Sequence, residues 1–94
     1  MSPRPCKVRK INGKFNVEYF KPRQIPMRNL KEVSLDICEA EAIRLADFEG
    51  MYQEAAAKEM EVSRQTFGNI INSARKKIAD ALINGKAIKI EEMI

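Results

Sequence analysis

One arginine and three side-chain amides lie between residues 64 and 72 at spacings that would place them on one face of a helix. They are Arg64, Gln65, Asn69 and Asn72. An arginine can donate two hydrogen bonds to guanine O6 and N7, and an asparagine or glutamine can bridge N6 and N7 of adenine. A face that served only solvation would more often carry glutamate and lysine. Together with Ser63 and Thr66 at the start of the same helix, these residues indicate a surface that reads base edges in a DNA major groove.

Candidate phosphate contacts lie in the N-terminal arm and between residues 53 and 77. Residues 1–31 contain nine basic residues and one acid, whereas residues 32–94 contain eight basic and twelve acidic residues. A basic segment of this kind is typical of proteins that contact a polyanion, although a basic face that only improves solubility would have the same composition. The candidate backbone contacts are Arg4, Lys7, Arg9 and Lys10 in the N-terminal arm, Gln53 before the proposed recognition helix, and Arg75, Lys76 and Lys77 within it.

The composition disfavours an enzyme and a metal centre. The chain has no histidine, which is the commonest general base and metal ligand, and no glycine-rich loop that would cradle a phosphate. Cys6 and Cys38 are 32 positions apart and form no C-x-x-C pair. We therefore expect two ordinary thiols rather than a zinc site or a disulfide. We also expect no cofactor, no bound metal and no small-molecule substrate.

Three helices should position the base-reading residues. Asp36 followed by Glu39 is a capping pattern for a first helix, which runs from residue 35 to a stop at Gly50. A second helix fits residues 52–60, and Ser63 is a favourable N-cap for a third that closes near Asn84 and Gly85. The apolar stripe of the third helix predicts its core face: Phe67, Ile70, Ile71, Ala74, Ile78, Ala81 and Leu82.

The second and third helices, joined by a turn at Glu61 and Val62, have the outline of a helix-turn-helix. Ala57, four residues before Glu61, is small enough to let the two helices cross closely. Glycine usually occupies the turn because it adopts a positive φ without steric cost. Glu61 therefore either adopts that conformation at a cost of about 1 kcal/mol or belongs to a slightly longer turn. Gly68 is unfavourable inside a helix. It therefore indicates close approach of another backbone, which we interpret as that of the DNA.

The N-terminal third is punctuated by prolines, so helix is not expected there. Asn12-Gly13 is the preferred dipeptide of a type I′ hairpin turn, and it joins two predicted strands at residues 8–11 and 14–19. Residues 21–27 form an extended connector, and a short strand at residues 87–90 adds to the hairpin.

These elements predict one domain that is mainly α with a small β element: a tri-helical, winged-helix-like helix-turn-helix with an N-terminal β hairpin and a short C-terminal strand. Its three parts are residues 1–34 (basic arm, hairpin and connector), 35–84 (the three helices) and 85–94 (the strand and tail).

Several segments resemble the UPF0251 (DUF134) family of small prokaryotic predicted DNA-binding proteins. They are residues 41–47 (EAIRLAD), 52–56 (YQEAA), 62–68 (VSRQTFG), 73–82 (SARKKIADAL) and 84–87 (NGKA), with Tyr19–Arg23 and Arg4-Pro5 upstream. The helix-turn-helix segment further resembles region 4 of sigma factors. The resemblance implies a DNA-binding fold over nearly the whole chain, and Glu61 departs from the family's usual glycine.

We therefore expect a cytoplasmic protein without a membrane segment, which binds double-stranded DNA sequence-specifically as a homodimer and regulates transcription. The helix that begins at Ser63 would enter the major groove, and the basic arm would lie on the backbone. Two other classes remain open: a protein-interaction module of the transcription machinery and an RNA-binding protein.

Overall fold

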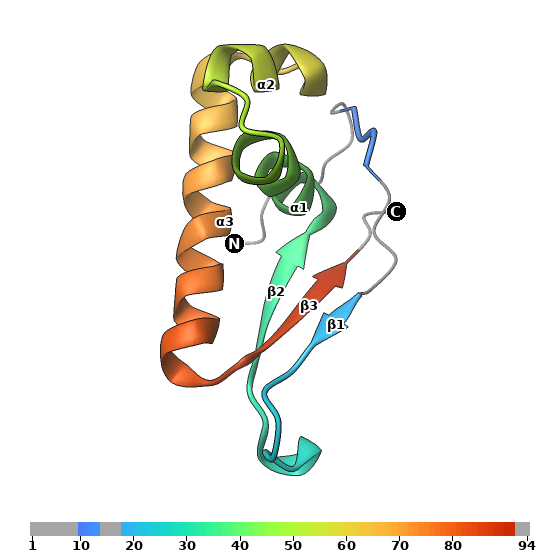
Figure 1. The fold of residues 1–94 in the computed structure, drawn as a ribbon, viewed down its shortest axis with the longest axis vertical. Helices are drawn as coiled ribbons and strands as arrows, with labels where there is room; N and C mark the ends of the chain where they lie inside the picture. Colours follow the sequence, from blue (N-terminus) through green and yellow to red (C-terminus); the bar gives the residue numbers. More distant parts are fainter. Residues whose placement is uncertain (1–9, 14–17, 92–94) are drawn as a thin grey trace.

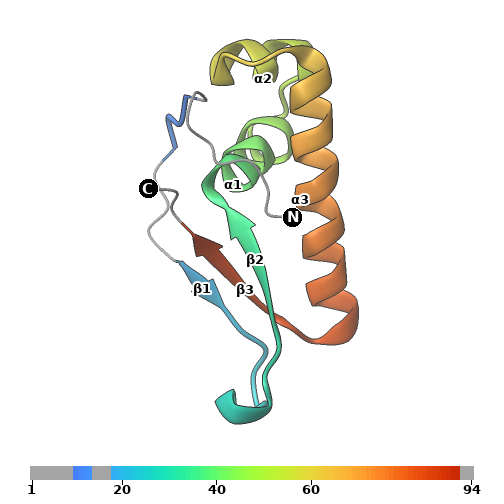
Figure 2. The ribbon, with the colours of Figure 1, turned by 180° about the vertical axis from the view of Figure 1, so that it is seen from behind.

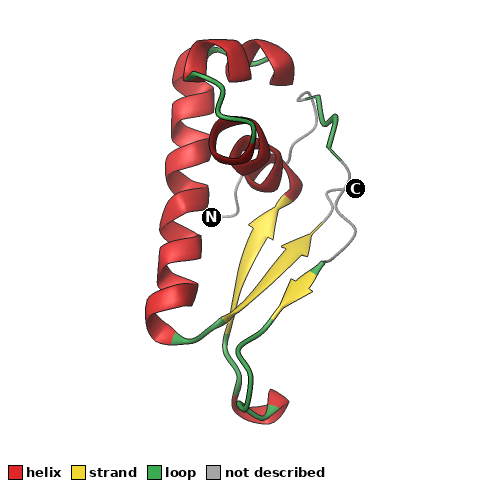
Figure 3. Ribbon diagram, viewed as in Figure 1, coloured by secondary structure: helices red, strands yellow, loops and turns green. Residues whose placement is uncertain are grey.

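The computed structural model describes residues 10–13 and 18–91. Within them the chain is mainly α with a small β-sheet, as predicted (Figures 1 and 3). The elements are β1 (Tyr19–Phe20), η1 (Met27–Asn29), β2 (Glu32–Asp36), α1 (Ile37–Ile43), η2 (Arg44–Phe48), α2 (Gln53–Met60), α3 (Arg64–Asn84) and β3 (Ala87–Glu91). Helix α3 runs along one side of the molecule, and the other helices and the sheet lie on its inner side (Figures 1 and 2).

The first helix begins at the predicted cap and stops at the predicted residue, but its second half has a form that was not predicted. The Glu39 N–H donates to Asp36 Oδ1 at 2.8 Å, and the Asp36 N–H donates to Glu39 Oε1 at 3.0 Å. These reciprocal bonds form a capping box. After Ile43 the chain widens into the π-helical segment η2, in which the Glu49 N–H donates to the Arg44 carbonyl at 2.8 Å. Gly50, at φ +77°, then ends the helix as expected.

The turn between α2 and α3 decides between the two alternatives for Glu61. Glu61 has φ 60° and ψ 44°, so it adopts the left-handed conformation itself. The Glu61 N–H donates to the Lys58 carbonyl at 3.1 Å, and the Val62 N–H donates to the Ala57 carbonyl at 3.0 Å. Ala57 is only 3% exposed, which agrees with its predicted place at the helix crossing.

The sheet has the order β1–β3–β2, with β3 antiparallel to β1 and parallel to β2. The C-terminal strand is confirmed, and it pairs with Tyr19 and Phe20 as expected for an addition to the N-terminal β element. Strand β2 was not predicted: the connector was expected at residues 21–27, and residues 35 and 36, expected to begin the first helix, are the last two residues of this strand. Its signal is an alternation in which Val33 is half-buried and Leu35 is buried, opposite Ile88 and Ile90 of β3.

The type I′ turn predicted at Asn12-Gly13 is wrong. Among the described residues with positive φ are Gln24 and Gly50, but neither Asn12 nor Gly13. Both backbone amides instead donate to the carboxylate of Glu41, and this long-range contact overrides the local turn preference. The predicted strands at residues 8–11 and 14–19 lie largely outside the described residues.

Helix α3 supplies the centre of the core. Phe67 and Ile71 are fully buried and pack with Met60 of α2 and Leu45 of η2. Ala74, one turn later, packs in a second cluster with Leu35 of β2. The predicted apolar stripe is therefore the core face over most of its length.

Two predictions about this core were wrong. Leu82 is 75% exposed, whereas its neighbour Ala81 is buried, so the last turn of α3 packs through Ala81 and Leu82 lies on its outer side. Cys38 is buried and disulfide-bonded rather than an ordinary thiol. The expectation of thiols rested on the spacing in sequence and on the assumed compartment, neither of which reports distance in the fold. Cys6 lies outside the described residues.

Candidate nucleic-acid interface

Helix α3 begins with a side-chain cap at Ser63. Ser63 Oγ accepts the Thr66 N–H at 3.0 Å and lies 2.9 Å from Thr66 Oγ1. The cap fixes the start of α3 and thus the direction of the residues that follow it. It also engages the hydroxyls of both residues, so Ser63 and Thr66 are less available for base contacts than the four residues below.

Four predicted base-reading residues form one exposed surface, the recognition surface: Arg64, Gln65, Asn69 and Asn72. None of the four side chains makes a hydrogen bond or ion pair with another described residue. Gln65, Asn69 and Asn72 follow at spacings of four and three, which places them in one row along the outer side of α3. Lys76 continues this row and is also exposed.

The other two predicted phosphate contacts of α3 are paired with acidic side chains of the protein. Arg75 Nη2 lies 2.7 Å from Asp47 Oδ1, and Arg75 Nε donates to Asp47 Oδ2 at 3.2 Å. The hydrogen bond from Arg75 lowers the pKa of the Asp47 carboxyl. Lys77 Nζ lies 2.8 Å from Oε1 of Glu39, a buried carboxylate that also accepts from Ser73. These residues tie α3 to η2 and α1, which leaves Lys76 as the base of this predicted group that has no ion-pair partner among the described residues.

The N-terminus of α2 lies beside the recognition surface. A Cβ placed on Gly68 would stand 3.4 Å from Gln53 Oε1, so Gln53 is the described neighbour of this glycine. Helix α2 has Tyr52 as its N-cap and no side-chain bond to its first amides. Those amides are the groups that a helix N-terminus offers to a phosphate.

Two exposed aromatic residues near this end were not predicted. Phe48 is 82% exposed and Tyr52 is 88% exposed, on either side of Gly50. Exposed apolar side chains mark a contact surface where they form a contiguous patch. Phe48 is the last residue of the π-helical segment η2, and Tyr52 is the N-cap of α2. Their closeness in sequence to Gly50, the expected end of the first helix, was the feature of the sequence that could have indicated their exposure.

The described part of the N-terminal segment is fixed against the helices by Glu41. The Glu41 carboxylate is fully buried and accepts from the Asn12 N–H at 3.0 Å, from the Gly13 N–H at 3.2 Å, and from two nitrogens of Arg44 at 2.9 Å each. Burial opposes its ionisation, but the hydrogen bonds from Arg44, Asn12 and Gly13 outweigh burial and lower the pKa of Glu41. We call Glu41, Arg44 and these two amides the Glu41 anchor.

The Glu41 anchor places Lys10 near the helix-turn-helix. The Lys10 N–H donates to the carbonyl of Met60, the last residue of α2, at 3.0 Å, and the Lys10 side chain is exposed. The other predicted arm residues, Arg4, Lys7 and Arg9, lie outside the described residues. Thus the structure brings one of the four arm residues next to the turn that precedes α3.

Within the described ranges, no group of three acidic or cysteine side chains is arranged to hold a metal ion. Over the same ranges, no helix is both long and apolar enough to cross a membrane. The body is also less acidic on its surface than its composition indicates, because Glu39 and Glu41 are buried beside Lys77 and Arg44.

Comparisons with known proteins agree with the sequence resemblance. Residues 1–92 match the family described as "Protein of unknown function DUF134". The chain is 57% identical over 89 residues to a UPF0251 protein of Thermoanaerobacter pseudethanolicus, with 95% of this chain and 75% of that protein covered. It is 58% identical over 89 residues to a UPF0251 protein of Caldanaerobacter subterraneus, with the same coverage. No solved structure shows significant similarity.

Proposed function

The chain belongs to the DUF134 family, whose description states no function, and from its geometry we propose that it binds double-stranded DNA sequence-specifically. The first turns of α3 would enter the major groove, so that Arg64, Gln65, Asn69 and Asn72 reach base edges. We further propose that the protein acts in the cytoplasm as a transcriptional regulator.

The observation that carries the proposal is the contrast between two parts of α3. In its second half, Arg75 and Lys77 are held by Asp47 and Glu39. In its first half, the guanidinium of Arg64 and the three amides are exposed and have no partner among the described residues. Side chains on one helix face whose hydrogen-bond donors and acceptors are free are available to an external ligand. The donor and acceptor groups of arginine, asparagine and glutamine match those that bases present in the major groove.

Phosphates on either side of the groove would be contacted from three places. Lys76 extends the row of the recognition surface. The first amides of α2 and the hydroxyl of exposed Tyr52 can donate to a phosphate beside Gln53. Lys10 begins the arm, which with Arg4, Lys7 and Arg9 would add contacts on the backbone or in the minor groove.

The test is binding to a library of random duplexes at low salt, followed by sequencing of the bound fraction. We expect an enriched sequence, and Arg64→Ala should reduce discrimination at one base pair by about 1–3 kcal/mol. Arg75→Ala is the matched control, because it removes an arginine from the same helix whose charge is already paired with Asp47. It should leave the selected sequence unchanged. A failure to bind any duplex would refute the proposal.

The exposed aromatic residues favour one other function, docking on a protein of the transcription machinery. Phe48 and Tyr52 are the observation in its favour. The two functions differ in their response to salt, because phosphate contacts make log affinity fall steeply with log salt concentration. A binding partner that is retained at high salt would support docking, and competition by single-stranded RNA would instead support RNA binding.

A further inference from the structure

The outer row of α3 changes character along its length. From Gln65 the row runs through Asn69, Asn72 and Lys76 and then reaches Ala79 and Ile83, at alternating spacings of four and three residues. The first part is polar and the last part is apolar, although every residue of the row is exposed. One continuous face of a single helix therefore carries two different surfaces.

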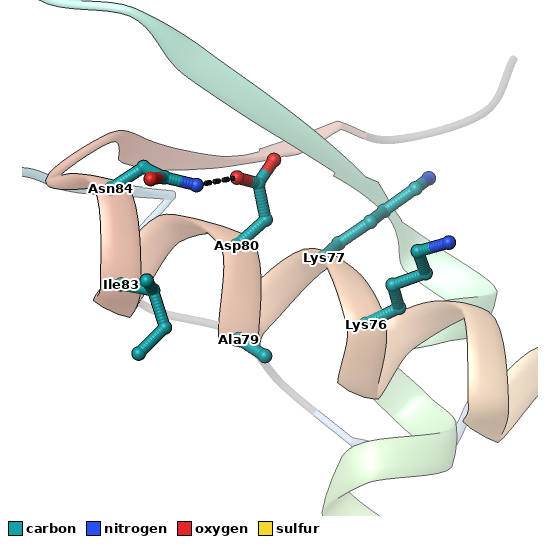
Figure 4. A pocket seen from close by; sticks show the side chains of 6 residues that line it. All are labelled: Lys76, Lys77, Ala79, Asp80, Ile83 and Asn84. Atoms are coloured by element: carbon teal, nitrogen blue, oxygen red, sulfur yellow. Dashed lines mark hydrogen bonds between the residues drawn. The ribbon is translucent and has the colours of Figure 1, made fainter.

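The apolar surface at the end of α3 consists of Ala79, Leu82 and Ile83, and we call it the apolar end. Leu82 is 75% exposed and Ile83 is 81% exposed. Ala79 and Ile83 point to the same side of the helix, beside the aliphatic chain of Lys76 (Figure 4). Two neighbouring aliphatic side chains at this exposure would be stabilised by burial against an apolar partner.

The charges around the apolar end allow it to face a copy of itself. Asp80 is held by Asn84 at 2.7 Å and by Lys86 at 3.0 Å, and Lys77 is held by Glu39. Among the described neighbours, Lys76 is then the unpaired charge at its border. A two-fold interface brings the same patch together from both subunits, so it requires a patch that does not repel itself. A small apolar surface whose acid is already neutralised fits this requirement, with Lys76 at its border directed to a phosphate in the proposed function.

The distance along α3 between the recognition surface and the apolar end gives a second reason to expect that the partner at the apolar end is a second copy of the chain. About fourteen residues separate the middle of the recognition surface from the apolar end, which at 1.5 Å per residue is about 21 Å. Two molecules in contact at their apolar ends could therefore hold their recognition surfaces up to roughly 42 Å apart, depending on the helix crossing angle. Half-sites on one side of DNA are about 34 Å apart, one helical turn, which lies within this reach.

We infer that two copies of this chain contact each other through Ala79, Leu82 and Ile83 when they occupy adjacent half-sites on one duplex. This inference rests on the proposed function, because the DNA holds the two copies in register. The contact is small for an interface that must be stable alone. It would therefore act as a cooperative contact that selects half-site spacing.

The experiment compares two duplexes that carry two copies of the half-site returned by the library selection. In one the half-sites are one helical turn apart, and in the other about five additional base pairs rotate them to opposite sides of the DNA. The wild-type protein should bind the first duplex about tenfold more tightly, within the ~5–150-fold range typical of coupling between sites. The double variant Leu82→Lys with Ile83→Lys should bind both duplexes equally. An equimolar mixture with Leu82→Glu and Ile83→Glu should regain the preference, since opposite charges would then meet.

The outcomes separate this inference from the proposed function. Phe20→Lys is the matched control, because Phe20 is a 51% exposed apolar residue on the far edge strand of the sheet. It should keep the wild-type preference for spacing. If the wild-type protein binds both duplexes equally, the contact between copies is refuted while DNA binding stands. If the lysine variant keeps the preference, the copies do not meet at the apolar end. If neither duplex is bound, the proposed function itself fails.

Discussion

Replacing Glu41 with glutamine tests how the N-terminal segment is held to the helices. The buried carboxylate accepts hydrogen bonds from the Asn12 and Gly13 amides and from two nitrogens of Arg44. In the Glu41→Gln variant one oxygen becomes an NH₂ group, which cannot accept. At least one backbone amide and one Arg44 nitrogen would then face this NH₂ group, which is itself a donor. Arg44 would also lose its buried counter-charge.

The expected cost in the free energy of unfolding is about 3 kcal/mol. Breaking a buried ion pair by removing one partner typically costs about 3–5 kcal/mol. The lower end applies here, because the Arg44 side chain is 24% exposed and keeps a second carboxylate, Glu49, at 3.3 Å. With a slope of about 1.5 kcal/mol per molar urea, such a loss lowers the unfolding midpoint by about 2 M.

Urea denaturation followed by circular dichroism measures this change, with Glu49→Gln as the matched control. That substitution removes a more exposed partner of the same arginine and should cost about 0–1 kcal/mol. A Glu41→Gln midpoint within about 0.5 M of the wild type would refute the assignment of Glu41 as an anchor.

The difference in stability between the wild type and the Glu41→Gln variant is expected to depend on pH. The folded-state pKa of Glu41 is lowered, so its carboxylate contributes stability above the ordinary glutamate pKa of about 4.3 and loses that contribution as the pH falls through the lower folded value. Glutamine does not titrate. The difference in stability between wild type and variant should therefore shrink in acid, and a constant difference from pH 7 to pH 2 would contradict the reasoning.

Three further predictions concern the helix-turn-helix. Glu61→Gly should raise the free energy of unfolding by about 0.5–1 kcal/mol, because glycine relieves the positive φ of 60°; a lower melting temperature would contradict this. Gly68→Ala should stabilise α3 by up to about 1 kcal/mol through helix propensity, since its Cβ meets only Gln53 Oε1 at 3.4 Å, and a simultaneous loss of DNA affinity would show that the glycine admits the duplex. Asp47→Asn should change stability by only about 0–1 kcal/mol, as for other exposed pairs, and should steepen the salt dependence of DNA binding if Arg75 is released toward a phosphate.

The sequence alone was sufficient where structure depends on neighbours a few residues apart. The capping box of Asp36 and Glu39 and the cap at Ser63 were predicted and are formed. The turn at Glu61 was placed correctly, although its two possible conformations could not be separated. The apolar spacing of α3 identified Phe67 and Ile71 as core. These features follow from side-chain chemistry and helical geometry, which are local.

Interactions between residues far apart in the chain could not be predicted from the sequence. Arg75 is 28 positions from Asp47, and Lys77 is 38 positions from Glu39, so no spacing rule identifies these pairs. The Asn12-Gly13 turn failed for the same reason, because Glu41, 28 positions from Gly13, binds its backbone. A local preference of this kind is outweighed by charge-assisted bonds to a buried carboxylate.

The sequence by itself therefore determined which residue types stand on the outer face of α3, since helical periodicity alone orders them. Only the tertiary structure decided which of them are available to a ligand. It pairs Arg75 and Lys77 with acids of other elements and leaves Arg64 and Lys76 without a partner among the described residues. It also buries Ala81 and exposes Leu82, because the last turn of the helix packs against the protein on only one side. Availability depends on what packs against a side chain, and packing brings together residues whose distance in the sequence says nothing about their distance in space.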